Sequence, residues 1–430
     1  MSRHFLFAMW EGGGNVSAML GLARRLIARG HRVSVLGDPT IADEATRGGC
    51  GFMSWRRAPH RKTLRPEDDL LRDWESPNAF AMLRTYRDRF IAIPAPDYAA
   101  DTLEAIDATA PDVLVPEFTL FGATMAAQAR GLPVAAIVPN IWPIPVPGVP
   151  PFGPGFAPPR TWLGRARDAL VLRLVLAIFA GGLPSLNATR RTLGLPPLAT
   201  FFDQVLTATA VFVQSSPTFD YSSRAVPANV HYIGPMLDDP DWAAPWTMPW
   251  PTDNEDPFVL VGFSSTFQDQ AAALRNVVRA LAPMRVRALV TLGEMLDADQ
   301  VPSQGAVVVL RSAPHRALLR HAALLITHCG HGTTLKGLAA GVPILCMPMG
   351  RDQNDTAARV VHAGAGLRLS PRASARTIAA AVRRLLEDDR YRANANRLRE
   401  ALAREAAACD PAEALERVAE PPARATSART

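Results

Sequence analysis

Short apolar runs alternate with segments of helical periodicity from the start of the chain. Residues 6–9 are apolar, residues 12–14 are three consecutive glycines, and residues 16–28 place apolar side chains at helical spacing before Gly30. Residues 31–36 then alternate between apolar and polar as a strand does. A strand, a glycine turn, a helix and a second strand are typical of the opening of a parallel α/β domain.

The same alternation returns further along the chain. Apolar runs at 112–115 and 134–138, with a helical segment at 121–130 between them, continue the first series. A second series comprises the runs and helical segments 258–263, 270–282, 287–292, 306–310, 323–327, 332–340 and 343–347, and a long helical segment at 373–409. Two separate series predict an α/β protein built from two Rossmann-like domains.

Composition marks the expected domain boundaries. Residues 238–256 are rich in proline, tryptophan and acidic residues, as in an extended linker. We therefore expect an N-terminal domain over 1–237 and a C-terminal domain over 257–408. A short helical segment at 409–420 follows, and the tail at 421–430 has the composition of a disordered terminus.

A proline-rich loop follows the apolar run at 134–138. Nine of the residues 139–159 are proline, and Trp142 and Phe152 stand among them. A stiff, apolar loop after the carboxyl end of a strand is a common ligand-binding element of α/β sheets. Trp142 and Phe152 are therefore expected to contact an apolar ligand. The alternative is a loop that only covers the helix after it. The apolar residues 169–180 of that helix would also suit an apolar ligand.

Overall composition narrows the class of protein. The chain has 430 residues, of which 48% are hydrophobic and 20% charged, enough to fill two cores. An excess of 46 basic over 40 acidic residues, spread over the chain, is too weak to indicate a nucleic-acid partner. The longest apolar stretch, 169–183, is interrupted by Arg173 and is shorter than the ~20 residues of a membrane span. We expect a cytoplasmic protein without stable membrane insertion, either a monomer or a homodimer.

Neither a metal nor a bound cofactor is expected. The cysteines are too few and too scattered for a disulfide framework or a zinc site: Cys50, Cys329, Cys346 and Cys409. Asp297 and Asp299 match the Asp-x-Asp pattern of some metal-dependent enzymes, but they belong to a loop expected to lie away from any ligand.

The segment 327–334 carries the most informative chemistry. An apolar run ends at Thr327, and His328, Gly330 and Gly332 precede a helical segment that begins with hydroxyl residues. Glycines let the backbone approach a ligand, and the free N–H groups of a helix N-terminus bind anions such as a diphosphate. The alternative is an ordinary strand-to-helix turn in which Thr333 caps the helix.

Three further loops at strand ends add polar groups. Ser264, Ser265 and Thr266 follow the run that begins at 258, and Asp352 and Gln353 follow the run at 343–347. A carboxylate beside an amide suits adjacent sugar hydroxyls. The loop around Ala313 lies one unit before the histidine segment. Four such loops at one sheet edge predict a crevice for a nucleotide sugar.

Residues 328–359 (HCGHGTTLKGLAAGVPILCMPMGRDQNDTAAR) make the chain resemble the GT-B glycosyltransferases of the UDP-glycosyltransferase type, particularly actinobacterial enzymes that glycosylate natural products. Weaker resemblance extends over 14–38, 262–266 and 233–235, so that it covers most of the chain. The resemblance implies two Rossmann-like domains facing across a cleft, with the acceptor on the N-terminal and the nucleotide sugar on the C-terminal domain. It also implies that the last helix crosses back to the N-terminal domain.

The resemblance assigns roles to the donor loops. It implies diphosphate contacts by the residues of the histidine segment, His328, Gly330, Gly332, Thr333 and Thr334. Support from Ser264, Ser265 or Thr266, contact of the base with Ala313, and binding of the sugar hydroxyls by Asp352 and Gln353 are also implied.

The chain departs from the family where the catalytic histidine is usual, because Asn15 stands there. Asparagine takes no proton at neutral pH. Glu117 aligns with the usual partner aspartate, and a glutamate in an apolar pocket can have its pKa raised far enough to act as the base. Glu11 is a second candidate. For both glutamates the alternative is a solvated loop carboxylate, and Asn15 could still orient the acceptor or the base.

A second departure is Lys336, where many members that use UDP-sugars have a glutamate that accepts the ribose hydroxyls. Lysine cannot accept them, so a dTDP-sugar, which lacks the 2′-hydroxyl, would lose less than a UDP-sugar. The alternative is a surface lysine, with the ribose held elsewhere.

These observations favour an inverting, metal-independent glycosyltransferase that moves a sugar from a dTDP- or UDP-sugar to a hydrophobic small molecule, for which we expect an aromatic or polyketide-like natural product. Asn15 supports the main alternative, a non-catalytic nucleotide-sugar-binding protein of the same fold. A nucleotide-sugar epimerase is a third possibility, for which Asp352 alone is an evident acid or base in the donor crevice.

Overall fold

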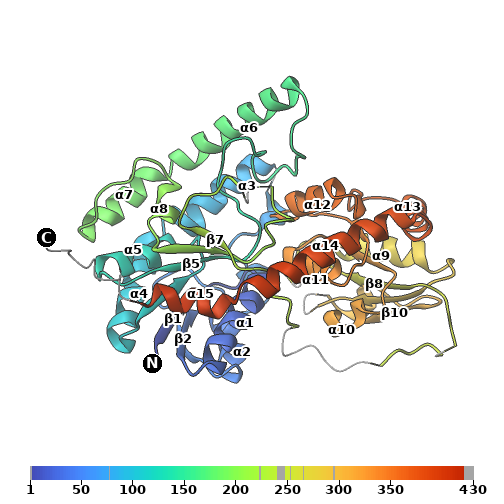
Figure 1. Cartoon of the computed structure of the whole chain (residues 1–430), viewed down its shortest axis with the longest axis horizontal. Coiled ribbons are helices and arrows are strands. Elements are labelled where there is room, and N and C mark those ends of the chain that lie inside the picture. The colour runs from blue at the N-terminus through green and yellow to red at the C-terminus, as the bar shows by residue number, and fades with distance from the viewer. Residues whose placement is uncertain are drawn as a thin grey trace, which may run out of the picture.

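The N-terminal half of the chain forms a parallel sheet in the order β3-β2-β1-β4-β5-β6-β7 (Figure 1). The computed structural model describes residues 2–76, 78–221, 224–239, 247–251, 253–264, 266–293 and 296–420. Bridges from Leu114 to Val134 and from Glu117 to Ile137 join β4 to β5. The strands are β1 (His4–Ala8), β2 (Arg32–Gly37), β3 (Gly51–Ser54), β4 (Val113–Pro116), β5 (Ala135–Val138), β6 (Ala210–Val213) and β7 (Val230–Tyr232).

The C-terminal half forms a second parallel sheet in the order β10-β9-β8-β11-β12-β13. Its strands are β8 (Phe258–Gly262), β9 (Arg287–Thr291), β10 (Val307–Leu310), β11 (Leu324–Thr327), β12 (Ile344–Cys346) and β13 (Gly366–Arg368). In both sheets the first strand lies inside and the chain winds outward from it in both directions, which is the doubly wound arrangement. The predicted α/β class with two Rossmann-like sheets is confirmed.

Helices connect the strands of both sheets. The N-terminal half contains α1 (Gly14–Ala28), α2 (Ala42–Arg47), α3 (Ala79–Tyr86), α4 (Ala95–Thr109), α5 (Phe121–Ala129), α6 (Trp162–Ala180), α7 (Leu183–Thr192) and α8 (Asp203–Leu206), with a π-helical turn η4 (Arg87–Ala92) and the 3-10 turns η1 (Pro39–Ile41), η2 (Pro66–Asp68) and η3 (Asp73–Glu75). The C-terminal half contains α9 (Ala271–Leu281), α10 (His315–Leu319), α11 (His331–Ala339), α12 (Gln353–His362), α13 (Ala375–Glu387), α14 (Asp389–Ala408) and α15 (Pro411–Val418), with the 3-10 turn η5 (Ala298–Gln300).

The single helix predicted over 373–409 is wrong, because the structure has two helices there. They meet at Asp388, whose backbone is extended and whose side chain accepts a hydrogen bond from the N–H of Arg390. A short carboxylate that binds the backbone in this way starts a new helix rather than continuing the old one.

The last helix, α15, lies against the N-terminal half (Figure 1). Ala412, Leu415 and Val418 belong to the same buried cluster as β1 and α1. Glu416 binds Arg29 at 2.7 Å and His31 at 2.6 Å. The two sheets are therefore tied together at the end of the chain as well as through residues 238–256. The boundaries given to that linker stay a prediction, and its residues 240–246 and 252, like the tail 421–430, lie outside the described residues.

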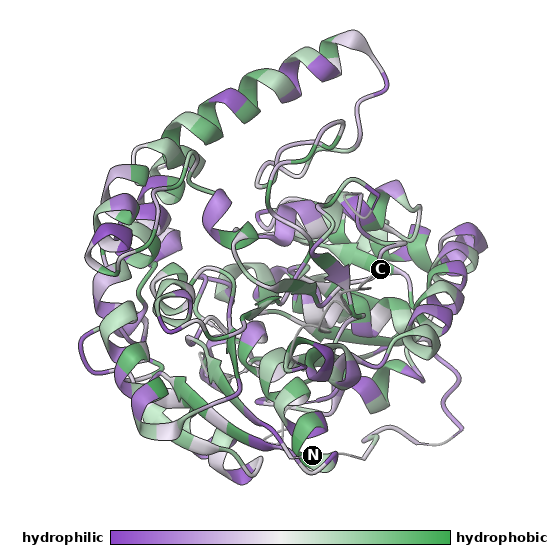
Figure 2. Ribbon diagram, turned by 60° about the vertical axis from the view of Figure 1, so that its left-hand side comes forward, coloured by the Kyte–Doolittle hydropathy of each residue, from purple (hydrophilic) through white to green (hydrophobic). Residues whose placement is uncertain are grey.

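Helix α6 extends away from the body of the molecule, as its position at the upper edge of Figure 2 shows. By length and composition alone, one helical stretch among the described residues, Trp162–Thr192, is long and apolar enough to cross a membrane, and about 22% of its most apolar 18-residue window is buried. Most of its surface faces outward, in contrast to the strands, whose residues in β1, β4 and β8 are all buried.

Candidate active site

One cavity of about 470 Å³ lies between the two halves of the chain and is lined by residues of both. Its C-terminal wall comes from the loops that follow β8, β9, β10, β11 and β12. Its N-terminal wall includes the glycine loop after β1, at 10–18, and residues 117–119 after β4. The carboxyl ends of both sheets thus meet at one cavity, where doubly wound sheets bind ligands, and its volume suits a small molecule.

The N-terminus of α11 opens into this cavity without a side-chain cap. Its N-cap residue is Gly330, and no side chain accepts a hydrogen bond there. The first N–H groups of a helix have no partner within it and are therefore available to an anion. Gly332 and Thr333 line the cavity, and a Cβ added to Gly332 would meet nothing within 4 Å. The alternative in which Thr333 caps the helix is wrong, because Gly330 holds that position.

His328 lies beside this N-terminus and is uncharged. Burial lowers the pKa of its imidazole to about 3, and the nearby charge of Arg351 lowers it as well. A Cβ added to Gly330 would come within 2.5 Å of Nε2 of His328, so glycine is required for the ring to lie where it does. A neutral imidazole can donate one N–H to a phosphate oxygen but supplies no positive charge.

The loop after β8 presents fixed hydroxyl groups. Oγ of Ser264 lies 2.9 Å from Oγ1 of Thr266, and the Thr266 N–H donates to Oγ of Ser264 at 3.1 Å. The buried amide of Gln270 donates to the backbone oxygens of Ser264 and Thr266, both at 3.3 Å. Both hydroxyl residues line the cavity, as expected for support of a donor. Ser265 lies outside the described residues.

Asp352 and Gln353 both line the cavity but are held differently. Oε1 of Gln353 accepts from the N–H of Met349 at 2.8 Å and of Gly350 at 3.1 Å, while its Nε2 donates to Gln268 at 2.8 Å. Its amide therefore holds the loop and has one N–H left for a ligand. Burial raises the pKa of Asp352 to about 6, against the lowering effect of Arg351. Asp352 remains the better placed of the two to accept sugar hydroxyls.

Arg351, directly before Asp352, joins the two halves across the cavity. It donates to both oxygens of Asp73, at 3.1 and 3.2 Å, and lies 3.6 Å from Asp69. It also donates at 3.2 Å to the backbone oxygen of Gly12 and to Oγ1 of Thr266. Arg351 was not among the site residues predicted from the sequence, although its place beside Asp352 in the histidine-containing motif was a usable signal.

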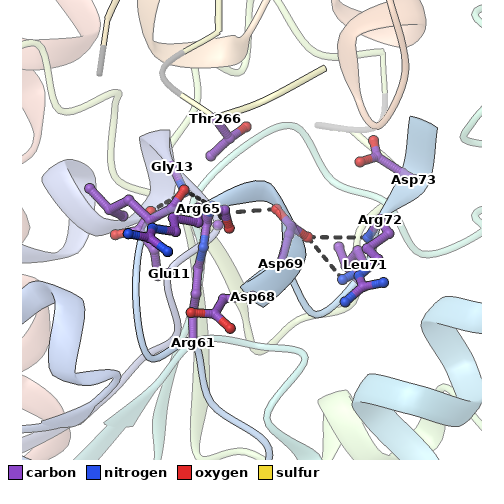
Figure 3. A network of polar contacts seen from close by, with 12 residues as sticks. Glu11, Gly13, Arg61, Arg65, Asp68, Asp69, Leu71, Arg72, Asp73 and Thr266 are labelled. Carbon is purple, nitrogen blue, oxygen red and sulfur yellow. Dashed lines mark hydrogen bonds and ion pairs between the residues drawn. The ribbon is translucent and has the colours of Figure 1, made fainter. Parts of the chain in front are cut away.

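The acidic segment that receives Arg351 is itself ordered by its backbone (Figure 3). Oδ1 of Asp69 accepts from the N–H groups of Leu71 at 2.9 Å and Arg72 at 3.2 Å. Its other oxygen lies 3.7 Å from Nη1 of Arg61, which is almost completely buried. Although burial lowers the pKa of Arg351, Asp73 and Asp69 raise it above its ordinary value, so the cation persists.

The far end of the C-terminal wall suits a nucleoside. Ala313 is buried at the cavity wall, as expected, next to His315, whose Nε2 lies 2.9 Å from Oγ1 of Thr291. Lys336 lines the same region and donates to Oδ1 of Asp239 at 2.8 Å. The side chains of Lys336 and Asp239 are only 12% and 18% exposed, respectively. The alternative of a surface lysine is therefore wrong.

Glu117 lies buried at the cavity wall, at the end of β4. Its Oε2 accepts from the indole N–H of Trp10 at 3.2 Å and from the backbone N–H of Thr119 at 3.0 Å, as well as from the Thr119 hydroxyl. Burial raises the pKa of Glu117 to about 7, although these hydrogen bonds lower it. The three bonds converge on Oε2 and leave Oε1 without a partner among the described residues. Because Glu117 is buried, the alternative of a solvated loop carboxylate is wrong.

Glu11 also lines the cavity, in a different environment (Figure 3). Its Oε1 accepts from the N–H of Gly13 at 2.8 Å, and its own N–H donates to buried Asp38 at 2.9 Å. Burial raises the pKa of Glu11 to about 7, while the charge of Arg61 lowers it. Because its carboxylate closes the glycine loop, Glu11 is engaged in holding the backbone.

Asn15 is a structural link of the glycine loop. Its Nδ2 donates to the backbone oxygen of Trp10 at 2.9 Å, and its Oδ1 accepts from the N–H of Gly12 at 3.2 Å. Asn15 faces the cavity but has no proton-accepting group at neutral pH. Its position fits an orienting role, since Trp10 in turn donates to Glu117.

The N-terminal wall is largely apolar. The aromatic and aliphatic side chains that line it come from α3, α5, α6, α8 and the proline-rich loop, and include Leu83, Tyr86, Phe121, Phe152, Val175, Phe179, Phe201 and Val205. Phe152 also packs against the core of the C-terminal half. Of the apolar helix expected to suit the ligand, only Val175 and Phe179 line the cavity.

Two predicted site residues lie away from the cavity wall. Trp142 is buried in the core of the N-terminal half, where its backbone N–H donates to Asp220 at 2.7 Å. It does not line the cavity, so its predicted contact with the acceptor substrate is not supported. Thr334 is fully buried behind the first turn of α11, and its hydroxyl has no partner among the described residues. Both point inward because the apolar packing of their segments decides the orientation.

Within the part of the chain that the structure describes, no group of three or more His, Cys, Asp or Glu side chains could hold a metal ion. Asp297 has a structural role instead, because it forms a capping box with Gln300 at η5. Neither Asp297 nor Asp299 lines the cavity.

Comparison with known proteins agrees with this geometry. Residues 276–420 match the domain family described as Erythromycin biosynthesis protein CIII-like, C-terminal domain. The chain is 30% identical over 424 residues to 4'-demethylrebeccamycin synthase of Lentzea aerocolonigenes, covering 97% of this chain and 99% of that protein. It is 27% identical over 417 residues to demethyllactenocin mycarosyltransferase of Streptomyces fradiae, covering 92% and 82%.

Solved glycosyltransferase structures share the fold. The glycotransferase of kitacinnamycin has a TM-score of 0.75 at 22% identity, covering 97% of this chain and 99% of that one. The glycosyltransferase VinC, solved in complex with dTDP, has a TM-score of 0.66 at 20% identity, with coverage of 97% and 99%. At these identities the likeness concerns the fold.

Proposed function

This chain belongs to the GT-B glycosyltransferases of actinobacterial natural-product biosynthesis, and we propose that it moves a sugar from a nucleotide diphosphate to a hydrophobic small molecule with inversion at the anomeric carbon. The supporting observation is that Glu117 and the uncapped N-terminus of α11 face one cavity from opposite halves of the chain. A base and an anion site on either side of a cavity are what a displacement with an anionic leaving group requires.

In the proposed reaction, Glu117 takes the proton of the acceptor hydroxyl on its free Oε1. The acceptor oxygen forms a bond to the anomeric carbon in line with the bond that breaks, and the electron pair of that bond leaves with the diphosphate. The diphosphate oxygens accept from the free N–H groups at the start of α11 and from His328, with hydroxyl support from Ser264 and Thr266. One in-line displacement inverts the anomeric carbon, and the scheme contains no metal.

The donor proposed is a dTDP-sugar rather than a UDP-sugar. Lys336 offers no acceptor to ribose hydroxyls, and Asp239, held by Lys336 and by the N–H of Arg316 at 3.0 Å, is the acceptor beside it. A deoxyribose needs one acceptor fewer than a ribose. The fold relative VinC was solved with dTDP, which is consistent with this choice. Ala313 would face the base and Asp352 the sugar.

The acceptor proposed is a hydrophobic, aromatic molecule, because Phe121, Phe152, Phe179 and Phe201 line its half of the cavity. A phenolic hydroxyl, with a pKa of about 10, needs a weaker base than an aliphatic alcohol does. Glu117, with a pKa of about 7, suits such an acceptor. All four cysteines are free, which fits the reducing cytoplasm proposed as the place of the reaction.

Release of nucleoside diphosphate by the purified protein tests the proposal. dTDP- and UDP-sugars are each combined with phenolic and aliphatic acceptors, with and without EDTA. We expect release that depends on a phenolic acceptor, is faster with dTDP-sugars and is unchanged by EDTA. Tight donor binding without release over the whole panel would favour the non-catalytic binding protein, and loss of activity in EDTA would contradict the metal-free scheme.

A further inference from the structure

Helix α6 presents an apolar face that no described part of the chain covers. The exposed fractions of Trp162, Leu163 and Leu170 are 68%, 61% and 60%. Leu174, one turn after Leu170, lies on the same face and is also exposed, whereas Leu176 is exposed on another side of the helix. Burying side chains of this size is worth roughly 1.5–3 kcal/mol each, so a soluble surface rarely displays five of them along one helix without a partner.

The opposite face of α6 is engaged with the protein. Asp168, Val175 and Phe179 repeat at helical spacing and are its buried residues. Val175 and Phe179 reach the wall of the cavity, and α3 packs alongside. Although its length and composition would allow a membrane span, inserting α6 across a bilayer would remove this wall from the acceptor half of the cavity. The helix is therefore placed to lie along a surface.

The charges around the apolar face are mainly positive. Residues 79–92 and 162–180 contain six arginines against two aspartates, an excess of four in a chain whose formal charge is +6. Both aspartates are already paired, Asp88 with Arg87 at 2.6 Å and Asp168 with Arg167 at 2.7 Å. The other four arginines, Arg84, Arg89, Arg165 and Arg173, form no ion pair with any described residue and are exposed.

This charge pattern selects the occupant. Arg173 lies within the apolar face, between Leu170 and Leu174, so a second copy packed on α6 would bring like charges together in a desolvated contact. Negatively charged lipid headgroups would instead pair with Arg165 and Arg173 while the leucines and Trp162 enter the boundary of the acyl chains. The neighbouring helix α3, which contacts α6, carries exposed Phe80 and Arg84.

We propose that α6, with α3 beside it, is a peripheral membrane-binding surface that lies flat on a bilayer containing anionic lipid. The cavity wall formed by Val175 and Phe179 is then on the underside of the helix that touches the lipid. A hydrophobic acceptor dissolved in the bilayer would have a short path to the site. Membrane binding by this surface would not require the chemistry proposed for the cavity.

Co-sedimentation of the full-length protein with lipid vesicles tests the proposal. Vesicles of phosphatidylglycerol and phosphatidylcholine are compared with vesicles of phosphatidylcholine alone, at low and high salt. We expect binding to the anionic vesicles that weakens with salt. The double variant R165Q/R173Q should lower the partition coefficient roughly 25-fold, since each arginine near an anionic surface contributes roughly fivefold.

The apolar contribution is tested by L163Q/L170Q, for which we expect a loss of at least tenfold by the transfer free energy of leucine. Val361 is an exposed apolar residue on α12, so V361Q is the matched control and should bind the vesicles as the unchanged protein does. Equal unfolding midpoints exclude misfolding as the cause. Absence of binding to anionic vesicles, or undiminished binding by both double variants, overturns the proposal. A dimer in light scattering that L163Q/L170Q converts to a monomer assigns the face to a second copy instead.

Discussion

Replacing Glu117 by glutamine tests the assignment of the base through two separate quantities. Glutamine keeps the shape of the side chain and can still accept from Trp10 and Thr119, but it takes no proton. A positioned general base contributes roughly 10²- to 10⁴-fold. We therefore expect kcat of E117Q to fall by that factor, with little change in the KM of the donor, whose proposed contacts lie on the other half of the cavity.

The dependence on pH carries the same information. The pKa of Glu117 is raised from its ordinary value of 4.5 to about 7, so the unchanged enzyme should lose activity as the pH falls through 7. The assay is kcat and kcat/KM for nucleoside diphosphate release from pH 5 to 9. E11Q is the matched control, because Glu11 shares the cavity and has a pKa also raised to about 7. If E117Q keeps activity within tenfold, or if E11Q alone removes the acid limb, Glu117 is not the base.

As the pH rises, the free energy of unfolding should fall while the activity rises. Because the folded pKa of Glu117 lies above its unfolded value, the folded state binds more protons between pH 4.5 and 7 and loses stability as the pH rises through that range. At pH 8 this pKa shift lowers the free energy of unfolding by about 3 kcal/mol, a loss that E117Q avoids. The loss vanishes near pH 4.5. Denaturation in urea at both pH values measures this difference. An E117Q protein that is less stable than the unchanged protein at pH 8 would refute the burial argument.

Three further substitutions test the rest of the cavity. Arg351→Gln should lower the free energy of unfolding by about 3–5 kcal/mol, because Asp73 is left buried without its partner, and Asp73→Asn in the same chain should recover most of the loss in urea denaturation. Gly332→Val adds a side chain in open space, so we expect an unchanged unfolding midpoint. Its affinity for dTDP, measured by calorimetry, should fall at least roughly 100-fold because the side chain blocks the start of α11. Unchanged affinity would remove α11 from the donor site. Asp239→Asn should raise the KM of the donor roughly tenfold, the value of one charge-assisted hydrogen bond, and leave kcat nearly unchanged.

The sheets were predictable because their strands are buried on both faces. Such strands need nearly continuous apolar runs, so the runs predicted at 287–292 and 306–310 differ from β9 and β10 by a single residue at one end. The place of the polar loops at the cavity was predictable for a related reason. Glycines and hydroxyl residues that follow an apolar run lie at the carboxyl edge of a parallel sheet, whatever the rest of the chain does.

Contacts between segments distant in sequence were not predictable. Arg351 and Asp73 are 278 residues apart, and no local pattern pairs an arginine with one particular carboxylate. No element was predicted over 79–109, where the structure has α3, η4 and α4, yet Tyr86 from α3 lines the cavity. Trp142 shows the same difficulty, since its place in a proline-rich loop suggested a ligand contact whereas packing turns it into the core.

The replacement of the usual histidine by Asn15 is best understood through Trp10. An imidazole at position 15 would itself face the cavity, whereas the asparagine binds the backbone of Trp10 and Gly12 on either side of the turn. That bond fixes the residue whose indole N–H donates to Oε2 of Glu117. In the proposed reaction, proton transfer takes place at the end of β4 rather than in the glycine loop, and asparagine suits position 15 because it orders the neighbour of Glu117 without competing for the proton.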